Sequence, residues 1–274
     1  MKLAIVSDIH ANLEALSASL REIAAAHADR VICLGDIVGY NANPSECIAL
    51  LREAGALCVA GNHDLAVTGR IGTQFFTDFA ARAVAWTRGQ LTPDELAFLA
   101  GLPLQLSIPH CLVAVHQALH PIEECDMAGL DSDERRRLTF EALMRHSSGA
   151  RICAFGHTHQ VGIYELRAGR LCTHDEQEVL LRDEAMYLLN PGTVGQPRSA
   201  ERRATCLLLD TESRAVAIRR VPYDARAAFL KARKAGLLPP FASIPAPLRS
   251  GLKWSARKLG LRKQRSPLQG WPNR

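Results

Sequence analysis

The sequence lacks the long apolar runs typical of membrane and exported proteins. No stretch approaches the roughly 20 apolar residues that a membrane-spanning helix needs, and the N-terminus MKLAIVSDIH has an apolar run of only four residues before Ser7. A secretory signal requires a longer apolar region. We therefore predict no transmembrane segment, no secretory signal and a cytoplasmic location.

Closely paired cysteines are missing as well. None of the eight cysteines forms a C-x-x-C pair, and Cys33, Cys58, Cys111, Cys153 and Cys206 lie in apolar, strand-like runs. A disulfide framework does not suit a chain of this size and expected location. The cysteines are therefore predicted to be free thiols that pack as small apolar side chains.

Acidic residues are absent from the end of the chain. The segment from Arg226 to Arg274 holds 12 of the 33 basic residues and none of the 28 acidic ones, so 21 basic and 28 acidic residues remain in the body. An acidic body suits a metal-binding site. The basic tail could bind nucleic-acid phosphates, lie on a membrane surface or a partner helix, or simply solubilise the protein or pack on the acidic body.

The first 65 residues alternate between short apolar runs and helix-like segments. The apolar runs Lys2–Ser7, Val31–Leu34 and Leu57–Ala60 are typical of buried strands, and segments 13–27 and 44–54 between them are predicted helices. Strands that alternate with helices at this spacing predict parallel βαβ units.

Three of the predicted helices begin with capping signals. Asn12 is a candidate N-cap for the first helix. Asn43, followed by proline, opens the second helix, and Thr92 repeats that pattern for a third.

The later chain is richer in predicted strands than in helices. Its apolar runs are Leu104–Ile108, Leu112–Val115, Ile152–Phe155, Val161–Leu166, Met186–Leu189, Thr205–Leu209 and Ala215–Val221. Segment 122–146 is charged and predicted to be helical, as a cap or a surface excursion, and 224–235 is predicted to be a short helix. A second sheet packed on the first is expected.

Conspicuous polar motifs follow the predicted strands. They are Asp8-Ile9-His10, Gly35-Asp36, Gly61-Asn62-His63-Asp64, His116 and Gly156-His157-Thr158-His159. Because the carboxyl ends of parallel strands meet at one sheet edge, these motifs could converge. Carboxylate, imidazole and amide groups together suit borderline divalent metals, and four imidazoles, two carboxylates and one amide exceed the needs of one four-coordinate ion. A pair of ions would use them all.

The order and spacing of these motifs resemble the calcineurin-like metallophosphoesterase superfamily, whose pattern is D-x-H, G-D, G-N-H-D or G-N-H-E, H and G-H-x-H. The resemblance covers residues 3–160, and Asn190-Pro191-Gly192-Thr193 is similar to the N-P-G-S turn of the small phosphodiesterase branch. It implies an α/β (α+β) fold, a four-layer αββα sandwich of two mixed sheets flanked by helices. The expected domain is 1–223, followed by a partly helical basic tail, 224–274.

The resemblance also implies a role for each motif residue. One metal would be bound by Asp8, His10 and His159, the other by Asn62, His116 and His157, with Asp36 bridging both. A hydroxide bridging the metals would be the nucleophile. His63 would contact the phosphate and protonate the leaving oxygen. The two divalent ions would be manganese in the first instance, with iron, zinc, nickel or cobalt as alternatives.

Four further residues near the motifs are candidates for the site, and two of them, Asp64 and Arg198, have two interpretations each. Asp64 would orient His63 or cap a turn. Arg198 would contact a phosphate oxygen or be a solvated loop arginine. Tyr40 and Asn41 follow Asp36 closely enough to line the pocket.

One motif departs from two branches of the family. Protein Ser/Thr phosphatases and symmetrical dinucleoside tetraphosphatases have G-D-x-V-D-R-G, whereas this chain has Gly39 and Tyr40 in place of the second aspartate and the arginine. In many relatives a glycine follows the lone histidine, but Gln117 follows His116 here. That side chain would narrow the approach to the second metal.

These departures leave a metal-dependent hydrolase of small phosphodiesters or phosphomonoesters as the predicted function. A nucleotide phosphatase, an RNA- or DNA-acting phosphoesterase that uses the basic tail, and a non-catalytic scaffold of the same fold are the alternatives. Degenerate scaffolds of this fold typically lack the histidine of G-N-H, which is present here as His63. No oligomeric state is predicted.

Overall fold

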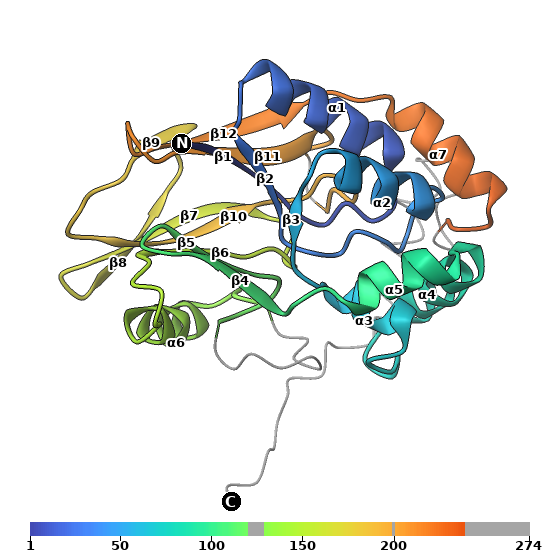
Figure 1. The fold of residues 1–274 in the computed structure, drawn as a ribbon, viewed down its shortest axis with the longest axis horizontal. Helices are drawn as coiled ribbons and strands as arrows, with labels where there is room; N and C mark the ends of the chain where they lie inside the picture. The colour runs from blue at the N-terminus through green and yellow to red at the C-terminus, as the bar shows by residue number, and fades with distance from the viewer. Residues whose placement is uncertain (120–128, 199–200, 239–274) are drawn as a thin grey trace, which may run out of the picture. The chain divides into compact units, whose positions relative to one another are not determined.

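The computed structural model describes residues 1–119, 129–198 and 201–238, in which two mixed six-stranded sheets lie face to face (Figure 1). From edge to edge, the first sheet contains β3 (Leu57–Cys58), β2 (Arg30–Cys33), β1 (Lys2–Val6), β11 (Ala204–Asp210), β12 (Ala215–Val221) and β9 (Glu178–Leu180). β1, β2 and β3 are mutually parallel, and β11, β12 and β9 continue the sheet by antiparallel pairing. The predicted parallel βαβ start of the chain is confirmed.

The second sheet has the same mixed character. Its order is β4 (Gln105–Ile108), β5 (Leu112–Val115), β6 (Ile152–Ala154), β10 (Met186–Pro191), β7 (Val161–Arg167) and β8 (Arg170–His174). β5, β6 and β10 run parallel to one another, whereas β4, β7 and β8 are paired antiparallel to their neighbours. β5 and β6 therefore end at one edge of this sheet.

Apolar side chains from both sheets form the core between them. Leu3 and Ile5 of β1 belong to the same buried cluster as Leu112, Ala154 and Tyr187 of the second sheet. Because side chains alternate between the two faces of a strand, the other residues of these strands face outward and need a second cover. Helices supply it.

Helices cover the outer face of each sheet (Figure 1). α1 (Leu13–Ala25) and α2 (Pro44–Glu53) pack on the first sheet, and α7 (Ala225–Lys234) packs against α1. α6 (Asp133–Met144), within the segment predicted to be helical, packs on β10 of the second sheet. The predicted four-layer αββα arrangement is confirmed.

Three further helices follow β3. They are α3 (Asn62–Thr68), α4 (Asp78–Gln90) and α5 (Pro93–Ala100), and α3 contacts both of the others. α4 was not predicted, because its buried face is built mainly from small residues, Ala80, Ala83, Val84 and Thr87, which give a weak apolar signal. This group of helices begins with three candidate site residues, Asn62, His63 and Asp64.

The predicted caps are partly correct. Asn12 Oδ1 accepts a hydrogen bond from the Ala15 N–H at 3.1 Å, and Thr92 forms a reciprocal capping box with Glu95. The prediction for Asn43 is wrong: its side chain makes no cap and instead donates to Glu46 Oε1 at 2.7 Å. The two side chains satisfy each other, so proline at the first helical position is the helix-start signal that remains.

The remaining predictions concern the cysteines, the extent of the compact unit, membrane-spanning helices and the segments around the undescribed residues. The seven cysteines within the described ranges are free thiols. The compact unit that contains the sheets spans residues 1–237 and includes α7. Among the residues that the structure describes, no helix combines the length and apolar character needed to span a bilayer. The predictions for residues 122–128 and for the basic tail beyond residue 238 lie outside the described residues.

Candidate metal centre

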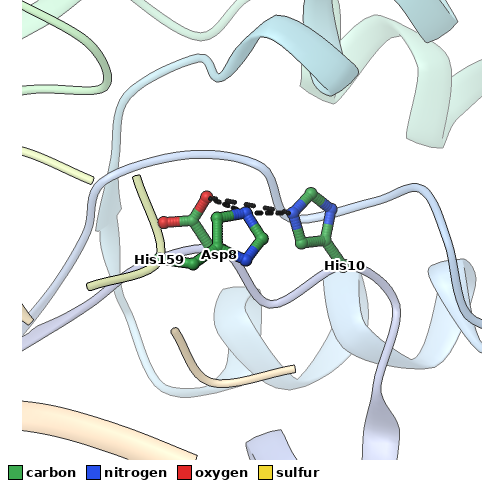
Figure 2. Close-up of side chains that lie close together, drawn as sticks. All are labelled: Asp8, His10 and His159. Carbon is green, nitrogen blue, oxygen red and sulfur yellow. Dashed lines mark hydrogen bonds and ion pairs between the residues drawn. The ribbon is translucent and has the colours of Figure 1, made fainter. Parts of the chain in front are cut away.

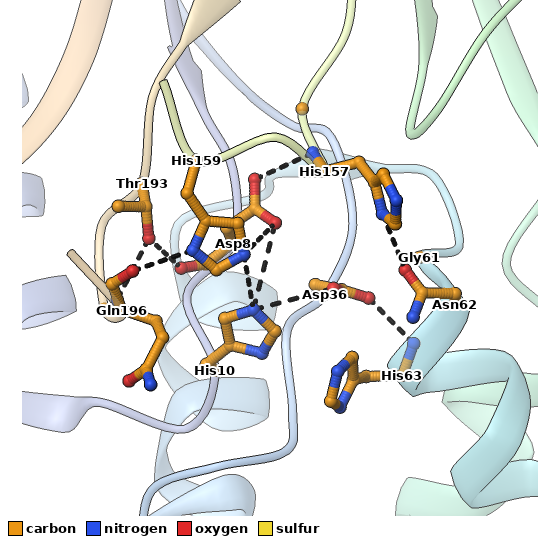
Figure 3. Close-up of polar contacts among 12 residues, drawn as sticks. Asp8, His10, Asp36, Gly61, Asn62, His63, His157, His159, Thr193 and Gln196 are labelled. Carbon is orange, nitrogen blue, oxygen red and sulfur yellow. Dashed lines mark hydrogen bonds and ion pairs between the residues drawn. The ribbon is translucent and has the colours of Figure 1, made fainter. Parts of the chain in front are cut away.

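The loops that follow β1, β2, β5 and β6, together with the start of α3, bring seven potential metal ligands to one edge of the two sheets. All seven residues that the sequence predicts as ligands lie in this group. Figure 3 labels Asp8, His10, Asp36, Asn62, His157 and His159. Five have left-handed backbone conformations, with φ of 53° at Asp8, 50° at His10, 51° at Asp36, 62° at His157 and 59° at His159. Side-chain-bearing residues adopt this region rarely and at a cost. The backbone is therefore bent at the positions where side chains must converge.

Asp8, His10 and His159 form the first group, with ligand atoms all within 4.8 Å of one another (Figure 2). His159 Nε2 lies 3.1 Å from Asp8 Oδ1 and 3.2 Å from His10 Nε2. The other ring nitrogens, Nδ1 of His10 and of His159, face the carbonyl oxygens of Val38 at 3.2 Å and Gln196 at 2.7 Å.

These contacts imply the tautomers of both rings. A carbonyl only accepts, so each Nδ1 carries a proton, and in the neutral form of each ring Nε2 presents a lone pair. Two lone pairs 3.2 Å apart beside a buried carboxylate oxygen that accepts no hydrogen bond, Asp8 Oδ1, repel one another. A cation between them would remove that repulsion, so the group fits a metal ion.

Asn62, His116 and His157 form the second group. Asn62 Oδ1 lies 3.1 Å from His116 Nε2 and 3.0 Å from His157 Nδ1. His116 Nδ1 faces the Leu34 carbonyl oxygen at 2.7 Å, so Nδ1 carries a proton and Nε2 points into the group. An amide oxygen and two imidazole nitrogens therefore meet here.

Asp36 stands between the two groups. Its Oδ2 is 3.6 Å from His10 Nε2 of the first group and 3.4 Å from His116 Nε2 of the second. Its Oδ1 accepts a hydrogen bond from the His63 N–H at 2.8 Å. One carboxylate oxygen is thus held by the backbone while the other faces both groups.

The buried carboxylates of the centre require a compensating positive charge. Burial alone would raise the pKa of Asp36, but the imidazoles of His116 and His63 outweigh it and hold the pKa well below the usual range. Conversely, burial would lower the pKa of His116, yet the carboxylate of Asp36 raises it to about 9. A proton on His116 compensates the buried carboxylates in the free protein, and a divalent cation would do so in its place.

His63 sits beside this centre with one ring nitrogen unused. Within the described residues its Nδ1 has no hydrogen-bond partner, and a Cβ at Gly39 would lie 2.4 Å from it. Burial, only partly offset by Asp36, lowers the pKa of His63 to about 4. The imidazole is therefore neutral at pH 7 in the free protein.

The Asp64 side chain binds backbone groups. Its carboxylate accepts from the N–H groups of Gly61 at 2.9 Å and Val38 at 3.2 Å. Burial and the neighbouring Asp36 raise its pKa to about 7 despite those bonds. It thus joins the start of α3 to the loop after β2, which is the capping alternative of the two that the sequence left open.

The three candidate substrate-binding residues are also close to the centre. Asn41 Nδ2 donates to the His10 carbonyl oxygen at 2.9 Å. The Tyr40 ring lies 4.6 Å from the rings of both His10 and His63, and Arg198 forms a hydrogen bond with the Tyr40 hydroxyl. Asn41 therefore shapes the loop, while Tyr40 and Arg198 flank His63.

Sequence reasoning missed several supporting residues. Thr193 Oγ1 donates to the Asp8 carbonyl oxygen at 2.8 Å, and Asn190 Nδ2 donates to Gly156 O and Thr158 Oγ1, both at 3.0 Å. The N-P-G-T motif was the available signal: this turn at the end of β10 ties the first ligand loop to the last. Phe76 and Phe79, the aromatic neighbours of His63 and Tyr40, had no motif to mark them.

Comparisons with known proteins agree with this geometry. The family model for the calcineurin-like phosphoesterase superfamily domain matches residues 1–214. An uncharacterised protein of Methanocaldococcus jannaschii is 34% identical over 234 residues, which cover 84% of this chain and 90% of that protein.

Solved structures give the same result. A metallophosphoesterase from Sphaerobacter thermophilus superimposes with a TM-score of 0.72 at 34% identity, covering 88% of this chain and 95% of that one. A hypothetical protein of Pyrococcus horikoshii shares the fold, with a TM-score of 0.69 at 17% identity over 86% of this chain and 94% of that one. The chain therefore belongs to the calcineurin-like phosphoesterase superfamily and is a hydrolase of phosphoester bonds.

Proposed function

We propose that the protein is a phosphodiesterase that uses two divalent metal ions, with manganese as the first candidate. The observation that carries the proposal is the position of Asp36 Oδ2, 3.6 Å from His10 Nε2 and 3.4 Å from His116 Nε2, between the two ligand groups. One carboxylate oxygen so placed can serve two cations at once. Bound cations would supply a nucleophilic hydroxide near neutral pH and neutralise charge on the phosphoryl oxygens.

The side chains around the ligands would handle the leaving group and the phosphate. The neutral imidazole of His63 donates a hydrogen bond to a leaving oxygen, and an anionic phosphate beside it would raise its low pKa and favour proton transfer. Arg198, exposed beside Tyr40, can pair with a phosphoryl oxygen. Small phosphodiesters, as in the similar small phosphodiesterase branch, are the proposed substrates.

The first test removes and restores the metal. Chelator-treated protein should hydrolyse neither bis(4-nitrophenyl) phosphate nor 4-nitrophenyl phosphate, and Mn²⁺, Fe²⁺, Co²⁺, Ni²⁺ or Zn²⁺ should restore turnover, faster on the diester. Elemental analysis should find about two ions per chain, and Asp36→Asn should lose both. If no ion restores turnover on either ester, the proposal is wrong.

The role of His63 needs a variant that keeps the metals. His63→Asn should retain the metal content and lose a factor of about 10² to 10⁴ in kcat, the usual contribution of a positioned acid or base. His27→Asn, at an exposed histidine in the turn after α1, is the matched control and should keep full activity. Equal kcat in the His63 variant and its control would exclude this role.

A further inference from the structure

Aromatic residues are scarce in this chain, yet they gather beside the candidate centre. Phenylalanine, tyrosine and tryptophan make up 5% of the sequence, and three of the eight phenylalanines, Phe75, Phe76 and Phe79, fall within five residues. This short segment leads into α4, which follows α3 and its His63. Tyr40, on the loop after β2, meets it from the other side.

The rings form a continuous set of contacts that ends on the catalytic candidate. The Phe79 ring stacks on Tyr40 with centroids 5.5 Å apart and planes 20° apart. Tyr40 in turn lies 4.6 Å from the His63 ring, and Phe76 meets the same imidazole edge-on at 5.0 Å. We call Tyr40, Phe76 and Phe79 the aromatic wall.

The backbone is arranged to put Tyr40 in this place. Gly39 and Tyr40 have φ of 94° and 60°, and the absence of a side chain at Gly39 lets the loop pass directly against the His63 ring. The loop is held by the Asn41 N–H, which donates to the carbonyl oxygens of His10 at 3.1 Å and Gly39 at 2.8 Å. A strained conformation kept for one aromatic side chain points to a use for that side chain.

Exposure separates the wall from the core. His10 and His63 are 0% and 3% exposed, whereas Tyr40, Phe76 and Phe79 are all half-buried, so the wall presents partly exposed rings in contact with buried imidazoles. Phe76 also packs on the core beneath the first sheet. Among the described residues, Tyr40 and Phe79 belong to none of the apolar core clusters. Core packing therefore accounts for only one of the three rings.

The wall also carries a positive charge at its edge. Arg198 forms a hydrogen bond with the Tyr40 hydroxyl and is itself exposed. Burial raises the pKa of Tyr40 more than Arg198 lowers it, so the phenol stays neutral. A guanidinium beside flat apolar rings matches a ligand with an anionic phosphate joined to a planar aromatic group.

We propose that the aromatic wall binds a planar aromatic group on the leaving-group side of the substrate, so that the preferred substrates are phosphoesters of nucleosides. This inference rests on the proposed function, because it places the leaving oxygen at His63. Half-exposed aromatic rings stack on nucleobases in a sequence-tolerant way. A base on Phe79 or Tyr40 would hold its sugar oxygen and phosphate toward His63 and the ligand groups.

The test compares ligands that differ only in the base. Calorimetric titration of Mn²⁺-loaded protein with adenosine 5′-monophosphate and with ribose 5-phosphate should give an affinity about tenfold higher for the nucleotide, a typical effect of one stacked base. Phenyl phosphate, a third ligand, separates a single aryl ring from a nucleobase. Because the measured quantity is affinity and not turnover, a protein that binds but does not hydrolyse would contradict the proposed function and leave the wall proposal standing.

Two single substitutions test whether the aromatic wall causes the difference in affinity. Phe79→Leu should bring the ratio of the affinities for the nucleotide and for ribose 5-phosphate close to one by weakening nucleotide binding. Phe75→Leu is the matched control: Phe75 is 66% exposed and, in the described part of the chain, has no ring contact, so its ratio should stay as in the unmodified protein.

Two outcomes would overturn the proposal. One is equal affinity for both ligands in the unmodified protein, a result that needs no variant to fold. The other is a ratio that falls equally in both phenylalanine variants.

Discussion

At the scale of single residues, the candidate centre depends on the ring nitrogens that face away from the ligand groups. Each of His10, His116 and His159 has its Nδ1 against a backbone carbonyl oxygen, at 3.2, 2.7 and 2.7 Å. These bonds fix the ring orientation and leave Nε2 for the metal. Because the acceptors are backbone groups, no side-chain motif indicates them. The sequence could therefore predict the candidate ligands but not the hydrogen bonds that orient their rings.

Close backbone approach explains the glycine of G-H-T-H. A Cβ at Gly156 would lie 1.9 Å from Ser7 Oγ and 2.9 Å from Asp8 Oδ2. We expect Gly156→Ala to push the last ligand loop away from the first, to lower the free energy of unfolding by about 1–3 kcal/mol and to weaken metal binding. Urea denaturation and metal titration would measure the two effects.

Gly89 supplies the control for that change. It lies inside α4, where an added Cβ would meet no atom within 4 Å. Gly89→Ala should raise the free energy of unfolding by about 0.5–1 kcal/mol, because alanine is the better helix former. Destabilisation of similar size in both variants would show that steric contact at Gly156 is not the cause.

The convergence of the seven candidate ligands could be predicted from the sequence because their motifs are short, ordered and placed after strands. The aromatic wall could not. Tyr40 and Phe79 are distant in the chain and meet only when α4 folds beside the loop after β2. Nothing in the local sequence of either residue indicates the other.

At the scale of elements, the beginning of α5 is fixed by a side-chain pair. Thr92 Oγ1 accepts from the Glu95 N–H at 3.3 Å, and Glu95 Oε2 accepts from the Thr92 N–H at 2.8 Å. Thr92→Ala should lower the free energy of unfolding by about 1 kcal/mol, since the Glu95 N–H loses its acceptor and Glu95 Oε2 loses the hydrogen bond from the Thr92 hydroxyl. Chemical denaturation would test this.

Asn43 is the natural comparison for Thr92. Both precede a proline at a helix start, but the Asn43 side chain makes no cap hydrogen bond. Asn43→Ala should therefore cost less than half as much as Thr92→Ala. A cost for Asn43→Ala as large as that for Thr92→Ala would mean that the exposed bond to Glu46 is as important as a true cap.

Most elements were predictable because their apolar residues follow the period of a strand or a helix. β8 was missed because polar or charged residues (Arg170, Thr173 and His174) make up most of it, and β9 because it has three residues with one buried side chain, Val179. α4 was missed because its buried side chains are small. In these cases tertiary pairing, more than local pattern, decides the structure.

At the scale of the whole molecule, the basic tail and the hydrolase can be separated by deletion. Every candidate ligand and the core clusters lie within residues 1–237, and 249–274 contains eight basic residues. Deleting 249–274 should leave kcat/KM for a small phosphodiester within twofold. If the tail binds phosphates, the deletion should weaken retention of single-stranded RNA and flatten its salt dependence.

The deletion has one informative contrary result. Loss of cooperative thermal unfolding in the shortened protein would show that the tail is part of the folded core. Unchanged RNA retention would assign any nucleic-acid affinity to the body.

The ligand loops come from both sheets and from positions 8 to 159, so neither sheet alone contains a complete set. A chain still emerging from the ribosome can hold Asp8 and Asp36 but cannot offer His157 or His159 until more than half of it has been made. Metal capture would therefore come late in synthesis, after the two sheets have met. A complete set of candidate ligands would then mark a chain in which parts of both sheets are in place.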